Sequence, residues 1–193
     1  MEKYNNILNF YKDYIKLEQV IRKGRLMCNV PSKRLESVAD HTLQLIMLAS
    51  VFTKELNMEV DLKKLMEMLL IHDLGETIIG DISEVEEDRK NKKVKEAEAI
   101  KEIFSNLSDE TSKYYYSLWI EMETQTTELA KFAYLLDKID AVIKAGIYEE
   151  EFNINNLFKE FSELQTQRKT FENSLLEEFF EFIKIKFNQK KVK

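Results

Sequence analysis

Glycine and proline are scarce in this chain, and their scarcity constrains the fold more than any other feature of the sequence. Among 193 residues there are 4 glycines and 1 proline. A β-sandwich or a β-barrel needs a turn roughly every 8–12 residues, and glycine and proline supply most such turns. Helices need far fewer turns, so the sequence predicts an all-α fold, a helical bundle.

Size, charge and cysteine content narrow the class of protein further. The length suits one domain covering residues 1–193. A net charge of −6 disfavours a nucleic-acid partner, and no apolar run reaches the roughly 20 residues of a membrane-spanning helix. Cys28 is the single cysteine, and the N-terminus has no cleavable signal pattern. We therefore expect a cytoplasmic protein with neither a nucleic-acid nor a membrane partner.

Apolar residues recur at helical spacing along most of the chain. They predict a first amphipathic helix that begins near residue 4 and fades near residue 22. Ser37, followed by Asp40, resembles a capping box that begins the second helix, and Asp61 can cap a third. The remaining predicted segments are helices at 62–74, 94–104, 108–119 and 127–147, an exposed loop at 82–91, and one or two closing helices within 157–187.

The last helix is crowded with large apolar side chains. These residues either close the core of the monomer or form a subunit interface, and the pattern fits both interpretations. They are Phe179, Phe180, Ile183 and Phe187.

Four residues with metal-binding side chains stand within apolar helix patterns. His41 and His72 are the only two histidines, which excludes chemistry that needs several imidazoles. Either one alone would more often be a core residue than a metal ligand. Asp73 and Asp137, however, each follow a strongly apolar run, and a buried aspartate must be paired, hydrogen-bonded or metal-bound. Together the four residues predict a site for a divalent metal ion.

Glu76 is a candidate general acid or base. It lies four residues after His72 and three after Asp73, so on a continuing helix it would share their face. A carboxylate beside metal-bound water is suited to proton transfer. Asp140 and Lys144 follow Asp137 by one and two turns, and each either supports the metal ligand, forms a polar helix edge or makes a dimer contact.

Several motifs resemble those of one family of enzymes. The order His41, His72-Asp73 and Asp137 is similar to the signature of the HD-domain metal-dependent phosphohydrolases. The match is longer for the HD-domain 5′-deoxynucleotidases of the YfbR type and the HD-domain-containing protein 2 type, and covers about residues 10–150. The motifs that carry it are ESVADHT at 36–42, HDLGE at 72–76, IGDI at 79–82, LW at 118–119, ETQ at 123–125, and AKF at 130–132, which leads to Leu136-Asp137.

The resemblance implies a fold, a reaction and a metal site. The fold is a single HD domain, with C-terminal helices that close its core or form a dimer interface. The reaction is hydrolysis of 2′-deoxyribonucleoside 5′-monophosphates to deoxynucleoside and phosphate through metal-activated water. His41, His72, Asp73 and Asp137 would hold one divalent ion, Co²⁺, Mn²⁺, Mg²⁺ or Zn²⁺. Asp73 and Glu76 would be the catalytic residues, and family members are generally homodimers.

The resemblance also implies substrate contacts. Arg22 matches an arginine expected at the 5′-phosphate, and Asp81 matches a residue near the sugar hydroxyl. The nearer family pattern is Arg-x-Gly-Trp, whereas here Arg25 stands in place of the tryptophan. Arginine can also stack on a base, so Arg25 is a third candidate for nucleotide binding.

Two other functions stay open at this point. Because Arg25 replaces the family tryptophan, the chain could also be an HD phosphohydrolase of different specificity, either a broad phosphomonoesterase or a cyclic-nucleotide phosphodiesterase. A further alternative is a non-catalytic helical interaction protein in which the metal ion only stabilises the fold. An HD-type di-iron oxygenase is disfavoured, because that branch needs more imidazoles than His41 and His72 supply.

Overall fold

A computed structural model describes residues 2–23, 33, 35–82, 89–152, 158–159, 162 and 174–189. Within these residues the fold is helical, with no strand and one isolated bridge between Ile21 and Ser37. The all-α prediction is therefore confirmed. The helices are α1 (Glu2–Tyr14), the 3-10 helix η1 (Ile15–Gln19), α3 (Val38–Glu55), α4 (Leu62–Ile71), α5 (Glu76–Ile79), α6 (Arg89–Phe104), α7 (Asp109–Thr124), α8 (Glu128–Phe152) and α10 (Ser174–Gln189).

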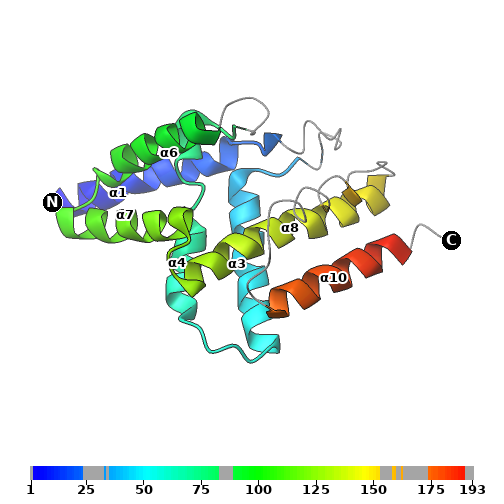
Figure 1. The fold of residues 1–193 in the computed structure, drawn as a ribbon. Helices are drawn as coiled ribbons and strands as arrows, with labels where there is room; N and C mark the ends of the chain where they lie inside the picture. The colour runs from blue at the N-terminus through cyan, green and yellow to red at the C-terminus, as the bar shows by residue number, and fades with distance from the viewer. Residues whose placement is uncertain are drawn as a thin grey trace.

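Helices α3 and α4 form the centre of the molecule, and the other helices extend to either side of them (Figure 1). Helices α1, α6 and α7 lie on the side of the N-terminus, whereas α8 and α10 run together toward the C-terminus. Helix α8 contacts α3, α4, α7 and α10, so it joins the two sides through a common core. Among the described helices, none is long and apolar enough to cross a membrane.

Capping residues set the beginnings of α3 and α4 as the sequence predicts. The Ser37 hydroxyl accepts a hydrogen bond from the backbone N–H of Asp40, and the Asp40 carboxylate accepts one from the backbone N–H of Ser37. The Asp61 carboxylate accepts from the backbone N–H of Lys64 at 3.0 Å. These local bonds orient the two helices that carry three of the candidate metal ligands.

The last helix closes the core of the monomer. Phe180 and Ile183 are buried, and the Phe179 ring lies 5.2 Å from the ring of Phe52 on α3. Phe187 packs against α8 at Gly146. Of the two interpretations that the sequence left open for this helix, the structure favours the core of the monomer for these four residues.

The first helix packs through a different face from the one that its periodicity suggested. Its stripe of apolar residues is exposed, whereas Phe10 stacks on Phe104 of α6 with ring centroids 6.2 Å apart. Helical spacing shows which residues share a face but not what covers that face. The exposed apolar residues are Tyr4, Ile7, Leu8, Tyr11 and Ile15.

Candidate metal centre

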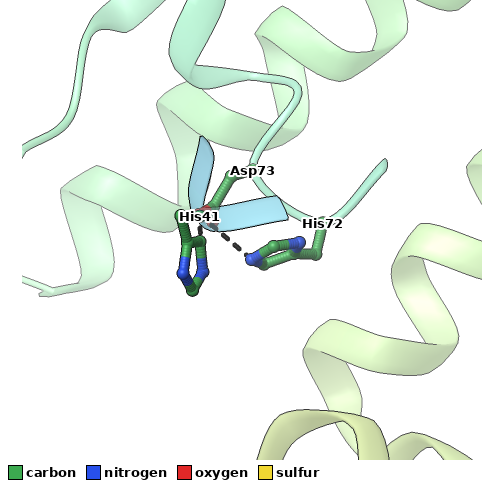
Figure 2. A group of neighbouring side chains, drawn as sticks. All are labelled: His41, His72 and Asp73. Carbon is green, nitrogen blue, oxygen red and sulfur yellow. Dashed lines mark ion pairs between the residues drawn. The ribbon is translucent and has the colours of Figure 1, made fainter. Parts of the chain in front are cut away.

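Three of the four predicted ligands converge on one point in the centre of the molecule. His41 comes from the first turn of α3, and His72 and Asp73 come from the turn that follows α4. One donor atom from each of these three side chains lies within 4.8 Å of the others. Figure 2 shows both imidazoles beside the Asp73 carboxylate, with dashed lines marking the two ion pairs.

Nε2 is the nitrogen that each histidine presents to the centre. Asp73 Oδ2 lies 3.0 Å from His72 Nε2 and 3.8 Å from His41 Nε2. The fourth predicted ligand, Asp137 on α8, contacts His41: its Oδ1 is 3.1 Å from His41 Nε2. All four predicted ligands are thus neighbours, although Asp137 stands outside the tightest group of three.

The other nitrogen of each ring is already bonded within the protein. His72 Nδ1 lies 2.7 Å from the carbonyl oxygen of Leu69, and His41 Nδ1 lies 3.0 Å from Asp140 Oδ2. Both Nε2 atoms are buried and make no hydrogen bond of good geometry, although a carboxylate oxygen lies 3.0 Å from His72 Nε2 and 3.1 Å from His41 Nε2. Buried polar atoms are normally satisfied, and imidazole nitrogens beside carboxylates are typical ligands of divalent metals. The donor set therefore fits a divalent cation.

The charged side chains of the candidate metal centre shift one another's pKa values. Burial alone would raise the pKa of Asp73, but the nearby His72 and Arg22 hold it well below its usual value. Burial alone would lower the pKa of His72, yet Asp73 more than offsets this and raises it to about 9. A proton on His72 thus compensates for the carboxylates, and a cation that binds there would displace it.

Glu76 lies beside this centre, but not for the reason that its spacing suggested. Helix α4 ends at Ile71, and after a turn the short helix α5 begins at Glu76, so no continuous helix joins it to His72. The side chain is 2% exposed, and Lys92 Nζ lies 3.8 Å from its Oε1. Its Oε2 is buried and has no hydrogen-bond partner.

The predicted substrate residues have different surroundings. Arg22 Nη1 donates to Asp73 Oδ2 at 2.8 Å, so the guanidinium lies at the edge of the candidate metal centre. Asp81 follows Gly80, whose φ of 75° is a left-handed conformation, and its carboxylate accepts from the backbone N–H of Lys23 at 2.6 Å. Arg25 lies outside the described residues, as does Cys28.

The structure also reveals neighbours that sequence reasoning missed. Lys138 Nζ donates to Asp137 Oδ2 at 2.6 Å, and its adjacency to a predicted ligand was the available signal. Trp119 Nε1 donates to the carbonyl oxygen of His72 at 3.1 Å, which helps to hold the turn after α4. Lys92, beside Glu76, comes from α6, and no sequence spacing links the two.

Comparisons with known proteins agree with this arrangement. A family model described as HD domain matches residues 15–179. A 5′-deoxynucleotidase HDDC2 from Bos taurus is 33% identical over 157 residues, covering 81% of this chain and 74% of the relative. One from Danio rerio is 35% identical over 147 residues, covering 76% and 71%. A conserved hypothetical protein from Pyrococcus furiosus superimposes with a TM-score of 0.75 at 28% identity, covering 92% of this chain and 98% of that one. The chain therefore belongs to the HD-domain family, as its motifs predict.

Proposed function

We propose that this protein is a metal-dependent phosphohydrolase that converts 2′-deoxyribonucleoside 5′-monophosphates to deoxynucleosides and phosphate. The observation that carries the proposal is the convergence of the buried Nε2 atoms of His41 and His72 on the Asp73 carboxylate, with one donor atom of each side chain within 4.8 Å of the others. The substrate class is supported by the relatives named 5′-deoxynucleotidase that match most of the chain.

One divalent ion is the proposed cofactor. His41, His72, Asp73 and Asp137 would hold it, and their mixed nitrogen and oxygen donors suit Zn²⁺, Co²⁺ or Mn²⁺, with Mg²⁺ as a further candidate. Such an ion, when bound, polarises a phosphate oxygen and activates a water molecule for attack. The protein contributes fixed ligand positions on helices packed around a common core.

Glu76 and Asp73 are the proposed catalytic residues. Glu76 is buried beside the centre, and burial followed by repulsion from Asp73 and Asp81 raises its pKa well above the usual value. A buried carboxyl group next to the candidate metal ligands is suited to exchange a proton with a water molecule there. Asp73 serves as a ligand that remains ionised.

The proposed substrate contacts come from Arg22, Asp81 and Arg25. Arg22, beside Asp73, can share its guanidinium with two oxygens of a 5′-phosphate. Asp81 is proposed to accept a hydrogen bond from a hydroxyl of the sugar. Arg25 is proposed to stack on the base in place of the family tryptophan.

Phosphate release tests the proposal. The protein is incubated with deoxynucleoside and ribonucleoside monophosphates, a general phosphomonoester and cyclic nucleotides, each with Co²⁺, Mn²⁺, Mg²⁺ or Zn²⁺. We expect hydrolysis of the deoxynucleoside monophosphates and its loss in Glu76→Gln. Faster turnover of cyclic nucleotides or general esters would support the alternative specificity. Metal binding without hydrolysis of any substrate would support the alternative of a non-catalytic interaction protein with a structural metal ion.

At the level of the whole protein we propose one domain, a homodimer, a cytoplasmic location and no nucleic-acid partner. The dimer is supported by exposed apolar residues along the middle of α3, where Leu43, Met47 and Val51 recur at intervals of four. The location and the lack of a nucleic-acid partner are supported by the net charge of −6 and the single cysteine. Sedimentation velocity of the wild type and of Met47→Glu tests the dimer, because a charge at the interface would separate the subunits.

A further inference from the structure

A group of polar side chains, three of them charged and buried, adjoins the imidazole nitrogen of His41 that faces away from the candidate metal centre, and two of them, Asp140 and Lys144, contact that nitrogen. Glu36 precedes the first turn of α3, and Asp140, Lys144 and Tyr148 follow one another at intervals of four residues along α8. Glu36, Asp140 and Lys144 are 4%, 5% and 6% exposed. We call these four residues and His41 the buried ion-pair network.

Each charged member of the network has a partner of opposite charge. Lys144 Nζ lies 2.7 Å from Asp140 Oδ2 and 3.2 Å from Glu36 Oε2, so one ammonium group joins two carboxylates. The Tyr148 hydroxyl donates to Glu36 Oε2 at 3.3 Å. Buried charges persist only where they are paired and hydrogen-bonded, and this pairing accounts for their place in the core.

The network presents a fixed acceptor to His41. Asp140 Oδ2 lies 3.0 Å from His41 Nδ1, and an ionised carboxylate can accept a hydrogen bond but cannot donate one. Lys144 Nζ is farther from the same nitrogen, at 3.4 Å, and could only donate to it. The closer contact favours the form of His41 in which Nδ1 carries the proton, and Nε2 is the ring nitrogen that faces the other candidate metal ligands.

We propose that Asp140 is a positioning residue for His41. Its carboxylate accepts a hydrogen bond from the His41 Nδ1–H, which leaves the lone pair of Nε2 directed toward Asp73 and Asp137. The Lys144–Glu36 pair holds Asp140 in place. Helix α8 thus supplies Asp137 to one ring nitrogen and Asp140, three residues later, to the other. This inference rests on the metal site of the proposed function and names the residues that prepare it.

Nuclear magnetic resonance of the full chain tests the inference directly, because the chain contains only two histidines. Protein labelled with ¹⁵N-histidine is measured free of metal, and His72→Gln assigns the two rings. We expect the Nδ1 of His41 to carry a proton that exchanges slowly with water. A wild-type His41 with no proton on Nδ1 would overturn the proposal without recourse to any other variant.

Asp140→Asn tests whether the carboxylate causes this arrangement. We expect the Nδ1 proton of His41 to lose its protection and the dissociation constant for Mn²⁺, measured by calorimetry, to rise about 10- to 100-fold. The matched control is Glu150→Gln, an exposed position on the same helix, which should leave both measurements unchanged. An Asp140→Asn variant with a protected Nδ1 proton and unaltered Mn²⁺ binding would contradict the proposal.

A second variant covers the case in which Asp140→Asn does not fold. An activity assay distinguishes failure of this inference from failure of the proposed function. If Asp140→Asn does not fold, Lys144→Gln is expected to weaken Mn²⁺ binding by loosening Asp140, and unchanged binding would refute the part assigned to Lys144. A protein that binds Mn²⁺ with a protonated His41 Nδ1 but releases no phosphate from any nucleotide would refute the proposed function and support this inference.

Discussion

Glu76 is deeply buried, and the cations near it, Arg22 and Lys92, do not offset the effect of that burial on its pKa. Its nearest ammonium, that of Lys92, is 3.8 Å away, and Lys92 is also shared with Glu96 at 3.4 Å. Burial raises the pKa of the Glu76 carboxyl, and repulsion by Asp73 and Asp81 adds to this effect. The folded, metal-free protein therefore holds a proton on Glu76 at a pH where the unfolded chain has released it.

Glu76→Gln should make the metal-free protein more stable at neutral pH. Because the pKa of Glu76 is higher in the folded state, stability is lost as the pH rises above the ordinary value of 4.5. The amide cannot ionise, so we expect it to gain on the order of 1–3 kcal/mol at neutral pH and nothing at low pH. Urea unfolding from pH 4 to pH 8 measures this difference.

The same Glu76→Gln variant should lose about 10²- to 10⁴-fold in kcat, because it removes the proposed proton-transfer group. Glu98→Gln, on the exposed side of α6, serves as the control for both measurements. A Glu76→Gln variant that keeps full turnover would remove Glu76 from the catalytic residues.

Arg22 is the cation closest to Asp73, with an N–O distance of 2.8 Å. If it binds the 5′-phosphate, Arg22→Gln should raise KM for a deoxynucleoside monophosphate at least about tenfold, equivalent to about 1.4 kcal/mol. Arg22→Lys should recover only part of this loss, because an ammonium lacks the two-pronged geometry of a guanidinium. Steady-state kinetics measure both effects. The exposed Lys16→Gln is the control, and an unchanged KM in Arg22→Gln would contradict the assigned role.

Helices α8 and α10 meet at a contact that depends on a missing side chain. A Cβ atom placed on Gly146 would lie 2.6 Å from the ring of Phe187. No real contact is that short, so the glycine is what lets the two helices approach. The aromatic residues of α10 then reach the core that surrounds the candidate metal centre.

Gly146→Ala should therefore destabilise the protein. Alanine gains about 1 kcal/mol of helix propensity over glycine, but the overlap with Phe187 should cost about 1–3 kcal/mol and produce a net loss. Thermal unfolding measures the change. The double variant Gly146→Ala with Phe187→Leu should recover the loss relative to Phe187→Leu alone. A more stable Gly146→Ala single variant would show that α10 adjusts without cost.

Binding of a metal should stabilise the whole molecule, because the candidate ligands come from α3, the turn after α4, and α8. A ligand that binds only the folded state at 100 times its dissociation constant adds about 2.7 kcal/mol. For a chain of this size we expect Mn²⁺ to raise Tm by roughly 5–10 °C and a chelator to reverse the rise. His72→Gln should show a much smaller rise, and an equal rise would place the metal elsewhere.

The sequence predicted much of this architecture, and particular residues show why. Ser37 and Asp61 begin helices by bonds to backbone N–H groups three residues away, so neighbouring sequence is sufficient to predict them. Asp73 and Asp137 stood out because each follows an apolar run. The sequence predicts that the third helix ends near residue 74, whereas α4 ends at Ile71; a Cβ atom placed on Gly75 would lie 3.3 Å from the backbone oxygen of Glu96, a residue distant in sequence.

The sequence by itself determined the all-α class, the places where α3 and α4 begin, and the four candidate metal ligands, whereas α6 begins at Arg89, inside the loop predicted at 82–91. Those features arise from backbone bonds within one turn and from the cost of burying polar groups in apolar patterns. Only the tertiary structure decided that Arg22 pairs with Asp73 and that Asp140 meets His41. It also decided that α10 fills the core while the apolar face of α1 stays exposed. Such outcomes depend on which distant helices meet, and helical periodicity carries no information about the partner.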